Sequence, residues 1–347
     1  MAMTSSPPDA DEAAALAAVR SGDQAAFAEL VERYRRPLHV HCYRMLGSFD
    51  DAEDMVQETM LRAWRGRAAF EGRSSVRTWL YRIATNACLN VLERAPRRVL
   101  SPEVTAPARA AQAPATAAPE IRWLQPYPDD LLGPASPPET EPEAMVISRE
   151  TIELVYLAAI QHLPPRQRAV LLLRDVLGWS ANDTAVLLEM SVASVNSALQ
   201  RARSTIRAEL PSGRLDWGPA RQSTEQERAV LQQFMDAFEQ ANVRALSEML
   251  REDARQTMPP IPLRFDGREA IVAHYAFLLG AESPGDFRLL ATWANRQPAV
   301  AAYLRPPGES EYSLSGLNVL RVEGGMIAEI TSFGADLCRG FRLPPTL

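Results

Sequence analysis

The feature that most constrains this chain is a helical pattern at residues 191–206, "SVASVNSALQRARSTI", with one apolar stripe and no acidic residue. The apolar residues recur every three or four positions, which is the spacing of one face of an α-helix. They are Val192, Val195, Leu199, Ala202 and Ile206. The other face carries Asn196, Ser197, Gln200, Arg201 and Ser204. An ordinary surface helix mixes both signs of charge, so this polar face is unusual.

A shorter helical pattern, "SANDTAVLLEM" at 180–190, comes directly before it. Ser180 with Asp183 forms a capping-box pattern, and Ser191 can cap the next helix. Two short helices about three residues apart predict a helix-turn-helix, whose second helix lies in the DNA major groove. Amides, hydroxyls and arginines can read base edges there, whereas acidic groups would be repelled by phosphates. The alternative is a helix that caps a bundle and faces water.

The distribution of charge agrees with a nucleic-acid partner better than the total does. The net charge is −6, and all 37 basic residues are arginine, which reflects a coding bias as much as a function. Residues 62–98 nevertheless carry nine arginines against Glu71 and Glu93, and acidic segments flank this block. We therefore expect one surface that contacts a polyanion and another that contacts a basic protein.

The chain divides into helical, linker and mixed segments. Helical patterns fill residues 12–98, including "DAEDMVQETMLRAW" (51–64), in which Ala52, Met55, Thr59, Met60 and Ala63 are predicted to face a core. An Ala- and Pro-rich linker spans 99–146 and contains an apolar island, "IRWLQPYPDDLL" (121–132), which we expect to dock on another part of the protein. Helices resume over 147–210, including "LPPRQRAVLLLRDVLG" (163–178), and a second linker covers 211–223.

Residues 224–347 read as an α+β domain. Helical patterns at 225–250 and 267–280 precede β-rich runs at 287–294, 299–306, 312–322 and 326–333, which predicts an antiparallel sheet after the helices. The sequence "EGG" at 323–325 is a hairpin turn between the last two strands.

Several classes of function are not favoured. No apolar run approaches the roughly 20 residues of a membrane span, and the first residues show no signal-peptide pattern. The three cysteines are far apart and odd in number, which fits reduced thiols in the cytoplasm. "HVHC" (39–42) lacks a second cluster that would complete a four-ligand site, so we assign no metal and no cofactor.

Residues 12–210 resemble an extracytoplasmic-function (ECF) sigma factor, the promoter-reading subunit of bacterial RNA polymerase. "DAEDMVQETMLRAW" matches the region-two helix of that family, "TWLYRIATNACLN" its promoter-melting helix, and residues 163–203 its region four. The resemblance implies two all-α sigma domains, region two at 12–98 and region four at 147–210. It also implies binding to core RNA polymerase, through the β′ clamp helices and the β flap, and to promoter DNA, with no chemistry of its own.

The resemblance assigns expected roles to individual residues. Asp51, Asp54, Gln57 and Glu58 would dock on the clamp helices; taken alone, they would read as a solvated acidic face. The loop 66–75 would engage the minus-ten element together with Arg73, Trp79, Arg82, Asn86 and Asn90. Trp79 is equally well read as a core residue. Asn196, Ser197, Gln200 and Arg201 would read the minus-thirty-five element, and Arg203 and Arg207 suit phosphate contacts.

Residues 224–347 resemble a SnoaL-like domain, which has a cone fold. ECF sigma factors with such an extension also carry a Trp-Leu-Pro-type linker motif, which "WLQPYPD" (123–129) resembles. The resemblance implies contact between Trp123, Leu124, Pro126 and Tyr127 of the linker and Gly324 and Gly325 of the extension, with control of the factor in cis. The cone is also a candidate site for a small-molecule ligand. Asp253, His274, Tyr275, Trp293 and Asp336 are candidate catalytic residues, but no spacing among them is diagnostic. The alternative function is a ligand-binding or catalytic cone that a helix-turn-helix tethers to DNA.

Overall fold

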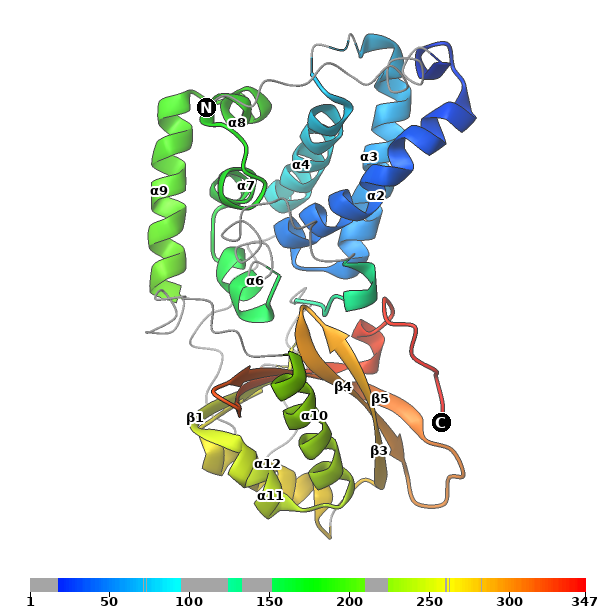
Figure 1. Ribbon diagram of the computed structural model, residues 1–347, viewed down its shortest axis with the longest axis vertical. Helices are drawn as coiled ribbons and strands as arrows, with labels where there is room; N and C mark the ends of the chain where they lie inside the picture. Colours follow the sequence, from blue (N-terminus) through cyan, green and yellow to red (C-terminus); the bar gives the residue numbers. More distant parts are fainter. Residues whose placement is uncertain are drawn as a thin grey trace. The chain divides into compact units, whose positions relative to one another are not determined.

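The computed structural model describes residues 18–70, 72, 74–94, 124–132, 152–209, 224–259, 261, 263–281 and 283–347. These residues fall into two compact units (Figure 1). The first unit contains residues 18–94 and 131–209, and the second contains 124–130 and 224–347. A piece of the predicted linker therefore belongs with the C-terminal residues.

The N-terminal half of the first unit is a bundle of three helices, α2 (Gln24–Leu46), α3 (Phe49–Gly66) and α4 (Val76–Arg94). A 3₁₀ turn, η1 (Arg67–Ala69), follows α3 directly. Each of the three helices packs against the other two. The Ser48 hydroxyl caps α3 by accepting the Asp51 N–H at 3.1 Å. Ala52, Thr59 and Ala63 are buried as predicted, while Met55 and Met60 are only half-buried.

The second half of this unit contains α6 (Leu154–Gln161), α7 (Pro165–Leu171), a π-helical turn η4 (Leu172–Val176), α8 (Ala181–Leu188) and α9 (Val192–Glu209). Helices α6, α7 and α8 all pack against α9. The helix expected over 163–178 is therefore shorter and ends in a π turn, in which the Leu177 N–H donates to the Leu172 carbonyl, five residues back.

The C-terminal unit has a six-stranded sheet with helices α10 (Thr224–Glu239), α11 (Val243–Met249) and α12 (Arg268–Leu279) (Figure 1). The strands are β1 (Leu250–Thr257), β2 (Arg264–Asp266), β3 (Asp286–Ala294), β4 (Gln297–Arg305), β5 (Ser313–Glu323) and β6 (Met326–Gly334), in the spatial order β2-β1-β6-β5-β4-β3. The four predicted strands are confirmed. The sheet is mixed rather than wholly antiparallel, because β1 pairs parallel with β6.

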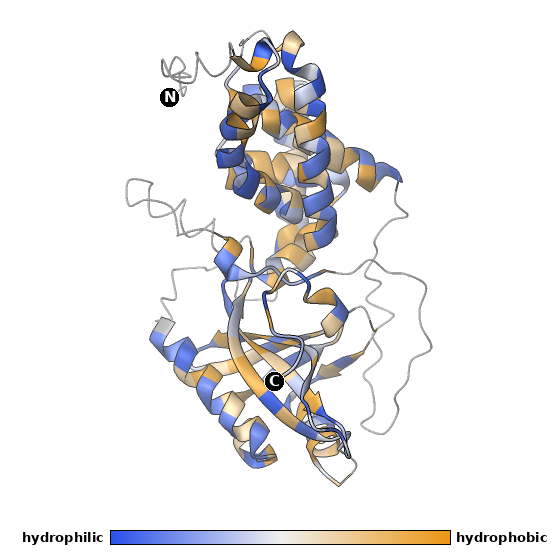
Figure 2. Ribbon diagram, turned by 90° about the vertical axis from the view of Figure 1, so that its right-hand side faces the viewer, coloured by the Kyte–Doolittle hydropathy of each residue, from blue (hydrophilic) through white to orange (hydrophobic). Residues whose placement is uncertain are grey.

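Strands β1 and β2 were not predicted because their sequences carry charges. Arg255 and Arg264 both bind Asp266, at 3.0 and 2.7 Å, so these polar residues form ion pairs along neighbouring strands. The apolar core lies between the sheet and the helices and includes Phe234, Leu246, Ile271, Leu320 and Ile330. Figure 2 shows hydrophobic and hydrophilic residues alternating along the helices of both units. No described helix is long and apolar enough to span a membrane.

Candidate nucleic-acid interface

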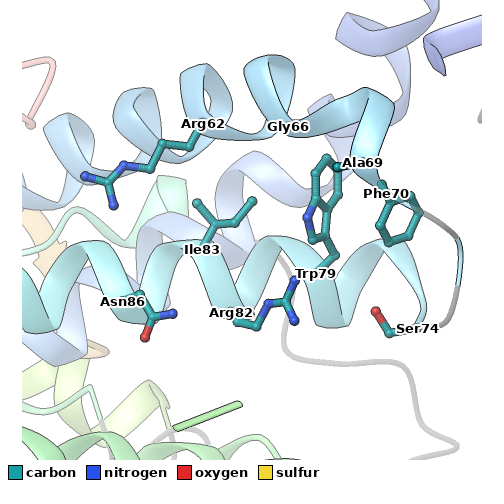
Figure 3. A pocket seen from close by; sticks show the side chains of 9 residues that line it. All are labelled: Arg62, Gly66, Ala69, Phe70, Ser74, Trp79, Arg82, Ile83 and Asn86. Atoms are coloured by element: carbon teal, nitrogen blue, oxygen red, sulfur yellow. The ribbon is translucent and has the colours of Figure 1, made fainter. Parts of the chain in front are cut away.

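A pocket of about 520 Å³ opens between α3 and α4, beside the turn that follows α3 (Figure 3). Its lining combines two aromatic rings with arginine, serine and asparagine side chains. The residues that line it are Arg62, Gly66, Ala69, Phe70, Ser74, Trp79, Arg82, Ile83 and Asn86. The pocket therefore joins residues of the two segments for which the resemblance implies contact with the minus-ten element, the loop 66–75 and helix α4.

The aromatic part of this pocket is a stacked pair. The rings of Phe70 and Trp79 have centroids 4.6 Å apart and planes 24° apart. Both side chains are less than a tenth exposed, yet both line the pocket. Trp79 is therefore both a packed residue and part of the pocket wall. A place in the core and a contact with the minus-ten element do not exclude each other. A flat aromatic wall beside cations suits an unstacked nucleobase.

The polar part of the pocket comes from one side of α4. Arg82 and Asn86 are exposed and lie one turn apart (Figure 3), as helical spacing requires. Asn90 is exposed one turn further along α4 and is not among the lining residues. Arg73 lies outside the described residues. Arg62, which the sequence did not single out, reaches the pocket from α3 and is held by Glu58 at 2.6 Å.

The acidic residues predicted to contact a basic protein lie on α3. Asp54 and Gln57 are exposed, while Asp51 and Glu58 are half-buried. Gln57 donates weakly to Glu53 at 3.5 Å, and Glu58 pairs with Arg62. The face remains open to a partner, but Glu58 is already engaged by an arginine of its own helix.

The helix-turn-helix has the expected caps and turn. The Ser180 hydroxyl accepts the Asp183 N–H at 3.0 Å and donates to its carboxylate at 2.6 Å. The Ser191 hydroxyl accepts the Ser194 N–H at 3.1 Å, at the start of α9. Between them, Glu189 follows the last residue of α8 and caps the helix with a left-handed backbone, φ of 53°. These local bonds fix where each helix begins and ends.

The polar face of α9 points to solvent. Asn196, Ser197, Gln200 and Arg201 are all exposed, and Val195, Leu199, Ala202 and Ile206 are buried. Val192, which the pattern placed on the apolar stripe, is instead 39% exposed. It is the first residue of α9, so the buried part of the apolar stripe begins at Val195.

Arg203 has a partner that sequence analysis missed. Its Nε donates to Asp175 Oδ2 at 2.9 Å, and a terminal nitrogen donates to Oδ1 at 2.7 Å. The hydrogen bonds to Asp175 raise the pKa of the arginine. No local sequence pattern predicts this ion pair, because the two residues lie 28 positions apart. Arg207 is exposed near the end of α9.

The linker segment 124–130 packs within the C-terminal unit. Tyr127 is 1% exposed, and Leu124 and Pro126 are buried. The Tyr127 N–H donates to the Asn295 side-chain oxygen at 2.8 Å, and the Asn295 N–H donates back to the Tyr127 carbonyl at 2.9 Å. The Arg296 N–H donates to the Asp129 carboxylate at 2.7 Å. The segment therefore lies on the β3–β4 turn, and the Tyr127 side chain is buried.

The glycine turn predicted to meet this segment has another neighbour. Gly324 and Gly325 join β5 to β6 with φ values of 59° and 79°, which favour glycine. A Cβ on Gly325 would lie 2.8 Å from the Gln226 side chain, so the turn approaches the first turn of α10. The hydrogen bonds of the linker segment given above go to Asn295 and Arg296. Trp123 lies outside the described residues, and the contact with Gly324 and Gly325 stays a prediction.

The candidate catalytic residues of the extension have ordinary surroundings. The Asp253 side chain is 71% exposed and bound to Arg251, whose guanidinium lowers the pKa of that carboxyl. Asp336 is exposed and Trp293 half-buried. His274 stacks on Phe265, and burial lowers the pKa of its ring. Burial raises the pKa of Tyr275. None of these shifts produces a carboxylate base with a raised pKa.

The histidines of "HVHC" (39–42) are packed within the helical bundle. His41 is 1% exposed and its Nε2 lies 2.9 Å from the Thr85 hydroxyl. His39 Nε2 lies 3.5 Å from Glu53. Within the described parts of the chain, no three His, Cys, Asp or Glu side chains come together as a metal site would require.

Comparison with known proteins gives three family matches in the order that the sequence predicted. Sigma-70 region 2 matches residues 30–98, Sigma-70 region 4 matches 153–206, and the SnoaL-like domain matches 231–330. The chain is 42% identical to the ECF RNA polymerase sigma factor SigG of Mycobacterium tuberculosis (strain ATCC 25618 / H37Rv), over 94% of this chain and 86% of that protein. It is 30% identical to the ECF RNA polymerase sigma factor SigW of Bacillus subtilis (strain 168), over 55% of this chain and 92% of that one.

Among solved structures, the fold is similar to the crystal structure of the Mycobacterium tuberculosis extracytoplasmic function sigma factor SigJ. The TM-score is 0.56 at 19% sequence identity, and the match covers 91% of this chain and all of that one. At this identity the likeness concerns the fold alone.

Proposed function

The chain belongs to the ECF RNA polymerase sigma factors, and we propose that it reads its promoters through two separate surfaces of the helical unit. As a member of this family it binds RNA polymerase and takes part in transcription initiation. The pocket between α3 and α4 receives bases of the opened minus-ten element, and the exposed face of α9 reads the minus-thirty-five element. We place its action in the cytoplasm.

The observation that carries this proposal is the composition of the pocket. Phe70 and Trp79 form an aromatic wall, and Arg82 and Asn86 stand at its edge. Stacking holds any base, arginine attracts the sugar–phosphate backbone, and an asparagine amide can bond to a base edge. A packed core has no need of an open pocket with this polar edge, so the arrangement supports single-strand binding.

The partner surface on polymerase is proposed from α3. Asp54 and Gln57 are exposed on its outer face, with Asp51 and Glu58 beside them. An acidic helix face complements the basic β′ clamp helices that the resemblance implies, and complementary charge speeds and orients association. The β flap is the proposed partner of region four.

The C-terminal unit is proposed to act in cis and not as an enzyme. Its support is the buried contact between Tyr127 and Asn295, which attaches the linker between the two sigma regions to this unit. Any change in the C-terminal unit that loosens the contact alters the linker. The exposed, arginine-bound Asp253 does not resemble a buried general base. A ligand that shifts the contact would regulate the factor.

The test is transcription from genomic fragments with purified core polymerase and the full chain. We expect discrete start sites that core polymerase alone lacks. Arg82→Gln should reduce open-complex formation at least tenfold with core binding unchanged, because it removes a cation from the pocket edge. Arg94→Gln, at the exposed end of the same helix, is the matched control and should stay within twofold. Equal effects of the two substitutions would reject the pocket as the minus-ten site, and no start sites would reject the whole proposal.

A further inference from the structure

Helix α9 begins with an apolar side chain that is open to solvent. Val192 is the first residue of α9 and is 39% exposed, although the other four residues of the apolar stripe are buried. At 100° per residue it lies about 20° around the helix from Leu199 and about 40° from Asn196. Val192 therefore borders the polar face of α9, in one row with Asn196 and Gln200, which follow it by one and two turns.

A single exposed valine is common on protein surfaces, so its exposure alone indicates no partner. The residue type at this position is less expected. The first turn of a helix favours acidic side chains, which interact with the positive end of the helix dipole, and valine is a weaker helix former because its branched side chain is restricted. The first turn of α9 has no acidic residue, and Ala193, the next residue, is exposed and apolar as well. The stability of the helix therefore does not explain Val192.

The position of Val192 within the helix-turn-helix suits contact with DNA bases. It directly follows Ser191, whose hydroxyl caps α9 by accepting the Ser194 N–H. In a helix-turn-helix, the N-terminal residues of the second helix contact base edges in the major groove. The missing acidic residues also leave this turn without a charge that phosphates would repel. The start of α9 thus presents an apolar side chain where base pairs are read.

Thymine is the base that offers an apolar group in the major groove. Its C5-methyl group projects into the groove, whereas the other bases present hydrogen-bond donors and acceptors there. The side chain of Val192 has neither a donor nor an acceptor, so it would leave such groups without a partner. Against a methyl group, valine removes apolar surface of both molecules from water. The chemistry of Val192 therefore complements thymine better than any other base.

We propose that Val192 is a specificity-determining residue that reads one thymine of the minus-thirty-five element through its C5-methyl group. It selects thymine by apolar contact, while Asn196 and Gln200 in the same row read neighbouring base edges by hydrogen bonds. This inference rests on the proposed function of the α9 face, and it adds the base and the chemical group that are recognised.

The first test removes the methyl group from the DNA. Uracil presents the same donors and acceptors as thymine but lacks the C5-methyl group. Polymerase that carries the full chain is titrated with promoter duplexes in which each thymine of the minus-thirty-five element is replaced singly by deoxyuridine. We expect an affinity loss of about fourfold at one position, which corresponds to about 0.8 kcal/mol, the contribution of one buried methylene-sized group.

Two negative results of this titration have different meanings. If no replacement lowers the affinity more than twofold, Val192 does not read a methyl group and the inference is overturned. If a duplex with a scrambled minus-thirty-five element binds as well as the natural one, the proposed function of the α9 face fails as well.

The second test changes the protein side of the same contact. Val192→Ala removes two methyl groups and keeps the helix, because alanine is the better helix former. We expect the variant to bind the thymine duplex at least threefold more weakly and the deoxyuridine duplex within 1.5-fold of the unaltered chain, so that the preference for thymine disappears. Equal weakening of both duplexes, or weaker binding to core polymerase, would assign Val192 to another contact and overturn the proposal.

Val186→Ala is the matched control. Val186 lies on α8, the first helix of the helix-turn-helix, is 74% exposed, and loses the same two methyl groups. The first helix crosses the DNA backbone and does not read base edges, so this variant should keep the fourfold preference for thymine. Loss of the preference in both variants would show that it does not arise from a contact of Val192.

Discussion

Arg203 on α9 and Asp175 on η4 form a two-pronged ion pair, with nitrogen–oxygen distances of 2.9 and 2.7 Å. The pair joins the proposed recognition helix to the π-helical turn, where the Asp175 side chain is 21% exposed and that of Arg203 53%. It is the side-chain contact that best explains how the polar face of α9 keeps its orientation. A planar fork on a carboxylate fixes direction as well as distance.

We predict that Asp175→Asn and Arg203→Gln each lower the free energy of unfolding by about 0.5–1 kcal/mol, because the pair is partly exposed to water. The double variant should cost less than the sum, since both changes break one interaction. Urea unfolding of the four proteins measures the coupling. Strict additivity would show that the pair contributes nothing, and would return Arg203 to its predicted role as a free phosphate contact.

A second prediction separates recognition of base edges from electrostatic attraction to phosphates on α9. Gln200→Ala should change the ranking of minus-thirty-five sequences, because an amide that bonds to a base edge discriminates by about 1–3 kcal/mol. Arg207→Gln should weaken all sequences alike and reduce the salt slope of log K by about one. Fluorescence anisotropy over a panel of duplexes and salt concentrations measures both. A uniform loss with Gln200→Ala would remove that residue from the reading face.

Local periodicity predicted the helix-turn-helix and part of the C-terminal sheet. The apolar stripe and polar face of α9, the caps at Ser180 and Ser191, and the four C-terminal strands all follow from spacings within a few residues. Contacts between distant residues could not be predicted in this way. Asp175 with Arg203, Tyr127 with Asn295, and Met45 with Arg168 are separated by 28, 168 and 123 positions. Their formation depends on how the elements pack, and no local pattern records that.

Val192 and strand β1 are two places where local periodicity gave the wrong expectation or none. An apolar stripe predicts burial only where another element covers it, and at Val192, the first residue of α9, the side chain is 39% exposed. The sequence of β1, "LREDARQT", has no run of apolar residues that would indicate a strand, and in the structure Arg255 pairs with Asp266 of β2. Periodicity detects a buried face and misses a strand stabilised by ion pairs.

The third prediction concerns acid. Burial, with Arg44 nearby, lowers the pKa of His41 to about 3 from its ordinary value of 6.5. Between these pH values His41 is protonated in the unfolded chain and neutral in the folded chain. The free energy of unfolding therefore falls as the pH falls from 6.5 toward 3. The loss from this group is about 1.4 kcal/mol per pH unit in that window. His41→Gln should give a shallower slope of unfolding free energy against pH. Identical slopes would mean that His41 is protonated in the folded chain.

The last prediction tests control through the linker. Asn295 is fully buried, has φ of 57°, and accepts the Tyr127 N–H. Asn295→Gly keeps this left-handed turn, since glycine adopts it readily, and removes the side-chain amide that holds the acceptor for the Tyr127 N–H. A buried donor without a partner costs about 1–3 kcal/mol, so amide exchange of residues 124–130 should rise about fivefold or more. Promoter output should then move in the direction produced by deleting residues 215–347, which itself should leave core binding intact.

Asn242→Gly is the matched control for that substitution. Asn242 caps α11 by accepting the Ala245 N–H at 3.1 Å, so the variant makes the same chemical change in the same unit and also loses one side-chain acceptor. Glycine replaces a capping asparagine at a cost of a few tenths of a kcal/mol, and neither exchange at 124–130 nor promoter output should change. If Asn295→Gly releases the segment while promoter output stays constant, the contact is structural, and control in cis must act through another part of the C-terminal unit.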